Sequence, residues 1–326
     1  MATFVPLDVK VTATGLYAPP RVETAAELAP RVGKTEAWIL ERTGVARRHI
    51  AEEPVERMGA LAAKAALADG PPPDLLLYAS ATQRQPIPDT SVFVERELGL
   101  EGLPCYSVHA TCLSFLVALH SAAALVAANA YGRILVVSSE IGSIARNFEE
   151  PESAVLLGDG AAAAVLEPTP SGESSKLKGY VLATYPRAAD YAEIRGYGSR
   201  VPVNHPDALP SDHLFHMNGT RLFRLAMVHI GDVLERLFAQ AGLKASDIDL
   251  VVPHQPSRGG LDSLARWGFP AERVVDILAE YGNCVAASLP MALATAHADG
   301  RLKRGHHVLL IGTGAGMSIG AAILEW

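Results

Sequence analysis

The feature that most constrains the fold of this 326-residue chain is an internal repeat. An apolar stretch opened by aspartate occurs as DLLLYASA at 74–81 and again, 175 residues later, as DLVVPHQP at 249–256. A second pair, RILVVSSE at 133–140 and HVLLIGTG at 307–314, is separated by 174 residues. An offset that stays nearly constant along the chain indicates that one structural unit has been duplicated.

Helical and closing segments extend the repeat. Each half has an alanine-rich apolar segment, one starting near Cys112 and the other near Asn283. Each half then ends in a glycine turn and a strand of small residues, GDGAAAAVLE at 158–167 and GAGMSIGAAILE at 314–325, with the offset reduced to 156. Continuous apolar strands that alternate with helices are typical of sheets covered on both faces. The sequence therefore predicts an α/β fold of two duplicated halves related by a pseudo-two-fold axis.

The boundary between the halves is predicted in the loop-like segment TPSGESSK at 169–176. We therefore expect an N-terminal half at 1–170 and a C-terminal half at 171–326. A stretch at 186–218 is rich in Pro, His, Gly and Asp and shows little periodicity. Loops of this length are commonly functional or mobile.

Composition narrows the class of protein. With 49% hydrophobic and 19% charged residues, the chain can bury a large core. A net charge of -7 argues against nucleic-acid binding, which normally needs a basic excess. Three irregularly spaced cysteines predict neither a disulfide framework nor a zinc site, and no HExxH, CxxC or Walker motif occurs. We expect a soluble cytoplasmic protein that binds no metal, nucleic acid or membrane.

Cys112 is the first candidate for chemistry. It stands in SVHATCLSFLVALHSAAALVAA, where a strand-like run passes into a helix. A thiol at a helix N-terminus is expected to favour the thiolate, and hence to be nucleophilic at neutral pH, because of the macrodipole and the free N–H groups. A lone cysteine in apolar surroundings is more commonly a small core residue, so position alone leaves both readings open.

His254 and Asn283 are the other candidates. His254 follows the apolar strand of LVVPHQPS, and ligands of α/β sheets gather beyond the carboxyl ends of strands. Its imidazole could donate a hydrogen bond to an oxyanion, accept a proton or simply satisfy a loop. Asn283, in EYGNCVAASLPMAL, precedes the helix of the second half, where asparagine is also a common N-cap.

Duplication brings these candidates together. Cys112 and Asn283 would occupy equivalent helix starts and face each other across the pseudo-two-fold axis, with His254 beside them. The glycine-rich turn GTGAG at 312–316 could approach a ligand closely and form an oxyanion hole, or be an ordinary tight turn.

Five segments in order give the chain a family resemblance. They are EAWILERTGVARRHI at 36–50, ATCLSF around Cys112, GDGAAAAVLE at 158–167, VPHQ around His254 and YGNCVAASLPMAL around Asn283. Together they resemble the beta-ketoacyl-acyl-carrier-protein synthase III family. The resemblance implies a five-layered thiolase-like fold of two related halves, a homodimer, and a Cys-His-Asn site at the bottom of a pantetheine tunnel.

The resemblance also implies roles for the site residues. Cys112 would accept an acyl group from a thioester, with the N–H groups of Cys112 and Ala315 as the oxyanion hole. His254 and Asn283 would polarise the carbonyl of a malonyl-type extender and stabilise the enolate formed by loss of carbon dioxide. Phosphopantetheine thioesters would be substrates, and no cofactor is implied.

Binding residues follow in the same way. Trp38 matches a tryptophan that stacks on the adenine of coenzyme A, and Arg42 a phosphate-side arginine. Arg224 matches a basic residue that helps to dock an acidic acyl carrier protein.

Five positions depart from the family pattern. The arginine that often sandwiches adenine falls at Pro151, and Ser257 replaces an asparagine that meets pantetheine. Thr313 and Met317 replace aromatics near the nucleophile, and Ile87 replaces a phenylalanine that closes the partner's acyl pocket. We expect altered acyl-length tolerance, since pocket shape sets acyl length.

Three functions remain open. The first is decarboxylative condensation in fatty-acid biosynthesis or, as the departures favour, in specialised-metabolite (polyketide) biosynthesis. The second is acyl transfer that forms an ester or amide, which Asn283 argues against. The third is a non-catalytic ketosynthase partner subunit, which Cys112 argues against. The acyl chain, the acceptor and delivery by coenzyme A or by carrier protein stay undetermined.

Overall fold

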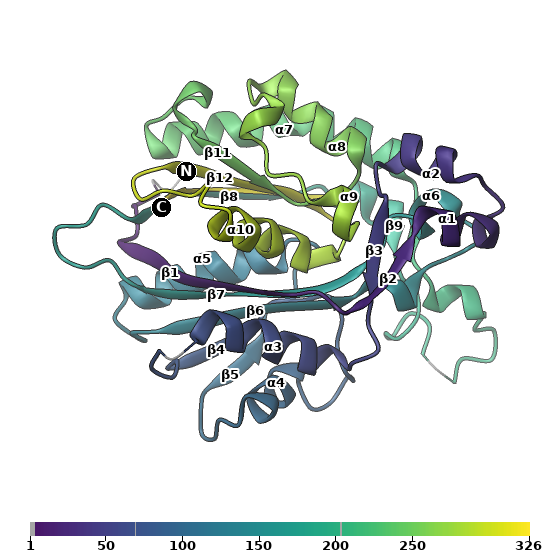
Figure 1. Ribbon diagram of the computed structural model, residues 1–326, viewed down its shortest axis with the longest axis horizontal. Coiled ribbons are helices and arrows are strands. Elements are labelled where there is room, and N and C mark those ends of the chain that lie inside the picture. The colour runs from purple at the N-terminus through teal and green to yellow at the C-terminus, as the bar shows by residue number, and fades with distance from the viewer. Residues whose placement is uncertain (1–3, 69, 203) are drawn as a thin grey trace.

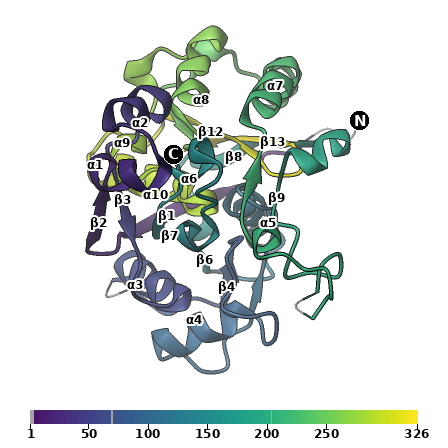
Figure 2. The same cartoon turned by 90° about the vertical axis from the view of Figure 1, so that its right-hand side faces the viewer.

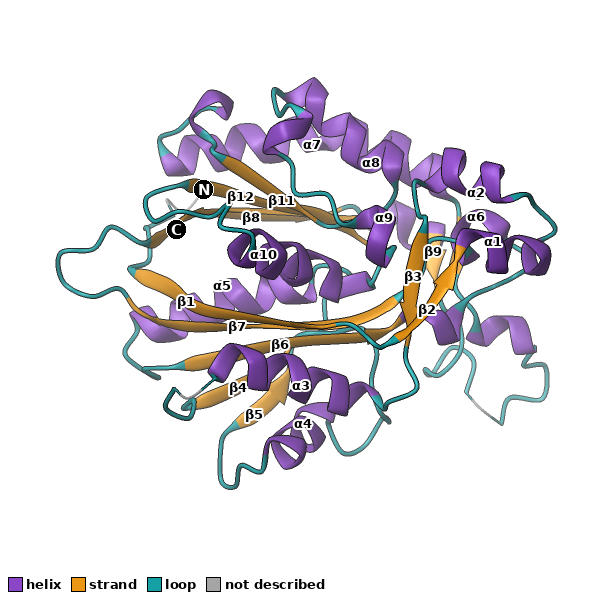
Figure 3. Cartoon of the chain, in the orientation of Figure 1, coloured by secondary structure: helices purple, strands orange, loops and turns teal. Residues whose placement is uncertain are grey.

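Two β-sheets form the framework of the computed structural model, which describes residues 4–68, 70–202 and 204–326 (Figures 1 and 3). The first sheet contains, in spatial order, β1 (Val9–Tyr17), β7 (Asp159–Pro168), β6 (Ile134–Ile141), β4 (Leu75–Tyr78) and β5 (Cys105–Ser107). The second contains β8 (Lys176–Thr184), β13 (Ser318–Glu325), β12 (His307–Gly314) and β11 (Leu250–Pro253).

Strand pairing confirms the predicted duplication. In both sheets the first two pairs are antiparallel and the third is parallel, so β1-β7-β6-β4 corresponds to β8-β13-β12-β11. Leu75 lies opposite Ile134 as Leu250 lies opposite Val308, which preserves the offsets read from the sequence.

The closing strands correct one of those offsets. Leu166 lies opposite Ile134, and Leu324 lies opposite Val308. The strands β7 and β13 therefore correspond at an offset of 158 rather than 156. The sequence offset was two residues too small because it was taken from the glycine turns, and the two turns differ in length.

Helices complete a five-layered arrangement (Figure 1). Between the sheets lie α5 (Ser114–Ala127) and α10 (Ser288–Ala298). The outer face of the first sheet is covered by α3 (Val55–Leu67) and α4 (Thr90–Leu98), and that of the second by α7 (Gly219–Ala241). The central helices are apolar nearly all round because a sheet lies on either side of them.

The two halves share one hydrophobic core. A single buried cluster combines residues of α5 and β6 with residues of α10 and β12, including Leu116, Val136, Leu293 and Leu310. The predicted boundary at 170/171 falls between β7 and β8. Because the inner faces bury each other, each half depends on the other for its packing.

Short elements gather at one end of the molecule, which faces the viewer in Figure 2. They are β2 (Arg21–Thr24), β3 (Arg47–Ile50), α1 (Ala25–Leu28), α2 (Glu36–Thr43), α6 (Pro151–Ala154), α8 (Arg258–Asp262) and α9 (Leu278–Tyr281). In its described residues, 186–202 and 204–218, the irregular stretch contributes β9 (Ala192–Glu193), β10 (His216–Met217) and 3₁₀ turns. None of the helices in the described part of the chain combines the length and apolarity that a membrane span requires.

Candidate active site

Cys112 lies on a tight connection that leads from β5 into α5. The Ser114 hydroxyl accepts a hydrogen bond from Ala110 N–H at 2.9 Å and donates one to Thr111 O at 2.7 Å. Thr111 has a φ of 52°, in the left-handed region that non-glycine residues seldom adopt. This strained connection holds Cys112 two residues before the helix begins.

The backbone N–H groups of Ala315 and of Cys112 itself lie near the sulfur of Cys112. Both lower the pKa of the thiol, but burial of the sulfur and the nearby Glu140 carboxylate act in the opposite direction, and burial dominates. The pKa rises to about 11. The expectation of a thiolate at neutral pH was therefore wrong for the substrate-free protein, because desolvation outweighs the favourable dipoles.

Glycines let the second half reach the nucleophile. A Cβ on Gly312 would lie 2.8 Å from the Cβ of His254, and a Cβ on Gly314 would lie 2.7 Å from Thr111 Oγ1. Thr111 Oγ1 donates to Ala315 O at 3.3 Å. The end of β12 therefore lies in close contact with both the Cys112 connection and His254. Side chains at these two glycines would prevent that contact.

His254 follows directly after β11 and is only 3% exposed. Its N–H donates to Ile311 O at 2.8 Å, which ties it to β12, and its Nδ1 is buried and has no hydrogen-bond partner among the described residues. Burial lowers the pKa of the imidazole to about 4. The side chain is therefore neutral at physiological pH and can act as a hydrogen-bond donor or as a base.

Asn283 is held between the halves. Its N–H donates to Leu156 O at 2.8 Å, and its carbonyl accepts from Gly158 N–H at 3.1 Å. The side-chain Oδ1 accepts from Val285 N–H at 2.9 Å, a local turn bond, and the N-cap of α10 is Ala287, so Asn283 does not cap that helix. With Oδ1 engaged, the Nδ2 amide group supplies the donors.

The helix starts correct the expected equivalence of Cys112 and Asn283. Cys112 lies two residues before α5, and the residue two before α10 is Ala286. Asn283 lies three residues further upstream, in a short parallel bridge with Leu157. Symmetry therefore pairs the nucleophile with Ala286, and the same offset pairs Asn283 with His109.

The adenine-side candidates lie together on α2. Trp38 is half-buried, with Lys34 Nζ 5.2 Å from its ring centroid, and Arg42 forms an ion pair of 2.8 Å with Glu152. Glu152 follows Pro151 in α6, so the helices bring this departure from the family pattern beside Arg42. Arg42 thus carries a carboxylate partner in place of a neighbouring arginine.

The remaining binding candidates are dispersed. Ser257 caps α8 by accepting a hydrogen bond from Gly260 N–H at 3.3 Å, and Thr313 is half-buried near the end of β12. Met317 is 1% exposed and packs in the cluster beneath α7. Ile87 is 85% exposed on the loop after β4, and Arg224 is exposed on α7.

Sequence reasoning missed two buried side chains beside the site. Gln255 is fully buried, donates to Pro253 O and Val275 O at 3.0 Å each, and accepts from Ile277 N–H at 3.1 Å, which fixes the segment after His254. Glu140, at the end of β6, is fully buried and influences the pKa of Cys112. In the sequence, these two residues were marked only as a Gln that follows His254 and a Glu at the end of an apolar strand.

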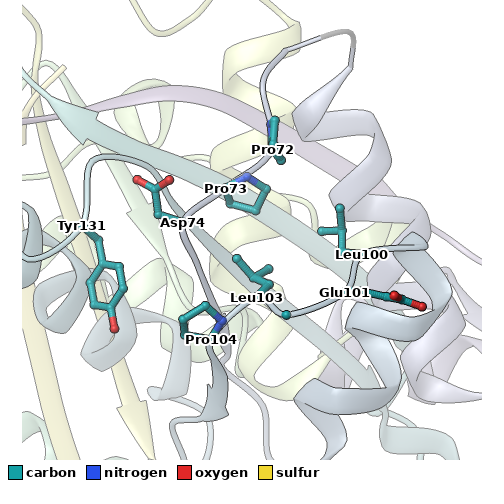
Figure 4. Close-up of a pocket in the computed structure, with 9 residues that line it drawn as sticks. Pro72, Pro73, Asp74, Leu100, Glu101, Leu103, Pro104 and Tyr131 are labelled. Carbon is teal, nitrogen blue, oxygen red and sulfur yellow. The ribbon is translucent and has the colours of Figure 1, made fainter.

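A surface hollow lies away from these residues. It is lined by the segments that precede β4 and β5, including Asp74, Leu103 and Pro104, and by Tyr131, which precedes β6 (Figure 4). Cys112 follows the other end of β5, so the hollow does not belong to the candidate active site. Within the described residues, His, Cys, Asp and Glu form no cluster of three that could hold a metal ion.

Family models match both halves of the chain. The model described as 3-oxoacyl-[acyl-carrier-protein (ACP)] synthase III matches residues 106–186, which contain Cys112. The C-terminal model of the same family matches residues 238–326, which contain His254, Asn283 and Ala315.

Curated relatives and solved structures agree with these matches. The chain is 31% identical over 324 residues to beta-ketoacyl-[acyl-carrier-protein] synthase III of Koribacter versatilis, covering 97% of each sequence. It is 36% identical to synthase III 3 of Streptomyces coelicolor, covering 97% of this chain and 96% of the relative. The crystal structure of 3-oxoacyl-(acyl carrier protein) synthase III from Pseudomonas aeruginosa superposes with a TM-score of 0.88 at 32% identity, covering 98% of both chains. The chain therefore belongs to the beta-ketoacyl-[acyl-carrier-protein] synthase III family of acyltransferases and has its thiolase-like fold.

Proposed function

We propose that this protein joins an acyl thioester to a malonyl-type carrier-protein thioester by decarboxylative Claisen condensation through an acyl-Cys112 intermediate. The observation that carries the proposal is the contact between Ala315 and the Cys112 connection, where Thr111 Oγ1 donates to Ala315 O at 3.3 Å and Gly314 lies against Thr111. This contact supports placing the N–H groups of Cys112 and Ala315 where they can donate to the oxyanion of a tetrahedral intermediate.

Acyl transfer is the first step. The Cys112 sulfur forms a bond to the thioester carbonyl carbon, and the oxyanion is held by the N–H groups of Cys112 and Ala315. Collapse breaks the bond to the pantetheine sulfur, and the proton lost by Cys112 ends on that leaving thiol. Because the free thiol has a pKa of about 11, this proton leaves during the reaction rather than before it.

Condensation is the second step. Neutral His254 and the Asn283 amide donate hydrogen bonds to the thioester carbonyl of the extender. Its carboxylate leaves as carbon dioxide, and the bonding electrons form an enolate. The enolate carbon attacks the acyl-Cys112 carbonyl, a carbon–carbon bond forms, and the Cys112 sulfur departs. A neutral imidazole suits this donor role because it carries an N–H at every pH above about 4.

Delivery by acyl carrier protein is proposed in preference to acyl-coenzyme A. Glu152 places a negative charge on Arg42, where a nucleotide phosphate would need a positive one. A carrier protein presents phosphopantetheine without adenine and can be steered by exposed Arg224. With the departures at Ile87 and Ser257, this supports a role in specialised-metabolite biosynthesis rather than in fatty-acid initiation.

A homodimer would complete the acyl pocket. The edge strand β5 leaves Tyr106 44% exposed, and Ile87 and Val92 are 85% and 45% exposed. A free strand edge beside exposed apolar side chains is suited to pairing with a second copy. Such pairing would bring Ile87 of one protomer to the other.

The experiment follows the acyl group and carbon dioxide separately. The protein is incubated with a panel of acyl-carrier-protein and acyl-coenzyme A thioesters, and Cys112 is examined by intact-protein mass spectrometry. Malonyl-carrier protein is then added, and carbon dioxide and beta-ketoacyl products are measured. Loading followed by transfer to an alcohol or amine without carbon dioxide would replace condensation by acyl transfer, and failure to load would remove the proposed function.

A further inference from the structure

The pseudo-two-fold axis identifies Glu140 as an exception to the symmetry of the site. Glu140 ends the repeat segment at 133–140, and its counterpart at the end of 307–314 is Gly314. The end of β12 packs against the Cys112 connection that precedes α5. Correspondingly, the end of β6 packs against the 3₁₀ turn Val285–Ala287, which precedes α10 and follows Asn283. One half therefore uses a glycine at this position and the other a buried acid.

The Glu140 carboxylate joins two chain segments. Its Oε1 accepts from Ala81 N–H at 2.6 Å, and its Oε2 accepts from Thr82 N–H at 2.8 Å and Thr82 Oγ1 at 2.6 Å. β6 also packs against the turn Val285–Ala287, and the Ala286 backbone lowers the pKa of this carboxyl. The first segment continues into the loop that carries Ile87, and the second is the continuation of Asn283.

Stability of the fold does not by itself explain why an acid occupies this position. The carboxyl is fully buried, and in the described part of the chain it forms no salt bridge. Burial raises its pKa to about 7 in spite of the hydrogen bonds. The titratable groups that face it are Tyr78 from β4, Cys112 and Cys284, with Asp159 of β7 acting on the same Cys284. Burying an acid without a cationic partner costs folding free energy, so such an acid beside reactive groups indicates a functional role.

The ionised carboxylate accepts hydrogen bonds at both oxygens and uses its full acceptor capacity. An amide NH₂ in place of either oxygen would face a backbone N–H. Glutamine at this position would therefore keep the size of the side chain and lose at least one hydrogen bond. Aspartate would keep the charge and lose reach.

We propose that Glu140 is a positioning residue for condensation. Its carboxylate holds the segment that follows Asn283, at Ala286, in a fixed position relative to the segment that leads to Ile87. It touches no substrate and acts through these two segments. This inference rests on the proposed condensation. The same carboxylate opposes thiolate formation at Cys112, so removing its charge should not slow acyl loading.

The test compares Glu140→Gln and Glu140→Asp with the wild type at the two half-reactions. We expect Glu140→Gln to load Cys112 at the wild-type rate or faster while kcat for condensation falls about 10- to 100-fold, the cost of a small misplacement in a site. Wild-type condensation should decline as the pH falls below about 7, as Glu140 becomes protonated. Glu140→Asp should regain part of kcat and keep this acidic limb, and Glu140→Gln should lack it.

Controls separate the possible outcomes. Asp249→Asn alters another carboxylate that accepts a backbone N–H, from His307 at 2.8 Å, but at the far end of β11, and should change neither half-reaction. If Glu140→Gln fails to fold, Thr82→Val removes one of the same hydrogen bonds. This variant should keep the wild-type loading rate and show a smaller fall in kcat for condensation. Equal losses in loading and condensation, or wild-type condensation in Glu140→Gln, would overturn the positioning role. A wild type that loads but does not condense would instead refute the proposed function.

Discussion

The hydroxyl of Thr111, next to Cys112 in the first half of the chain, donates a hydrogen bond to the carbonyl oxygen of Ala315 in the second, at 3.3 Å. The contact exists because Gly312 and Gly314 let β12 approach His254 and Thr111 within distances that a Cβ would not allow. The nucleophile is therefore completed by residues about 200 positions away, brought there by the packing of two sheets on shared helices.

Cys112→Ala should abolish self-acylation and product formation, because the acyl group then has no nucleophile. Cys105→Ser and Cys284→Ser should still load: Cys105 donates to Glu95, and Cys284 is fully buried, with its pKa raised well above the usual value. Intact-protein mass spectrometry after incubation with an acyl thioester checks all three. An acylated Cys112→Ala protein would mean that another residue is the nucleophile.

Alkylation of Cys112 by iodoacetamide should be slow at pH 7 and accelerate about tenfold per pH unit until the pH approaches about 11. The reason is that only the thiolate reacts, and burial keeps the thiol protonated. The measurement is the pseudo-first-order rate at Cys112 between pH 7 and 10, followed by mass spectrometry. A rate that is already maximal at pH 7 would contradict the raised pKa and restore the thiolate expected from the helix position.

His254 should make the free energy of unfolding depend on pH. In the folded state the pKa of the imidazole is about 4, and in the unfolded state it returns to its ordinary value near 6.5. Below that value the unfolded chain binds the proton and the folded chain does not, so stability is lost as the pH falls from 6.5 towards 4. At pH 5 the loss is about 2 kcal/mol relative to neutral pH.

The check on that loss is urea unfolding of the wild type and of His254→Ala at pH 7.5 and pH 5. The variant should lose less stability between the two values by about that amount. Identical pH dependence in the two proteins would show that His254 is already accessible to protons in the folded state.

Gly312→Ala and Gly314→Ala should each lower acyl loading by at least about tenfold, since the added methyl would push β12 away from His254 or from Thr111. Each should also cost about 1–3 kcal/mol of stability, the usual range for overpacking. Gly198→Ala is the control, because nothing lies within 4 Å of its Cβ position. Loading rates and thermal melting of the three proteins test the close approach.

Loading from acyl-carrier protein should show a higher kcat/KM than loading from the matching acyl-coenzyme A, and added salt should shrink the advantage. Glu152→Gln frees Arg42 for a phosphate, so it should raise kcat/KM for coenzyme A thioesters a few-fold. The gain is small because both side chains of the pair are more than half exposed. Faster loading from coenzyme A thioesters by the wild type at low salt would count against carrier-protein delivery.

The sequence alone determined the duplicated α/β fold, the family and the segments that carry Cys112, His254 and Asn283. The duplication is visible because apolar strands, at 75–78 and 250–253 and at their partners, repeat at a constant spacing. A pattern of this kind can be read directly from the order of residues. The family motifs are likewise contiguous, so no spatial information was needed to recognise them.

Only the tertiary structure decided the electrostatics of the site and its true symmetry. Desolvation depends on everything packed around a group, so a cysteine placed beside a helix start acquired a pKa of about 11 and not a lowered one. Ala286, rather than Asn283, became the counterpart of Cys112 because α10 begins at Ser288, five residues after Asn283, whereas α5 begins two residues after Cys112. Glu140 gained its place between Ala81, Thr82 and Ala286 from three segments that meet only in the folded chain.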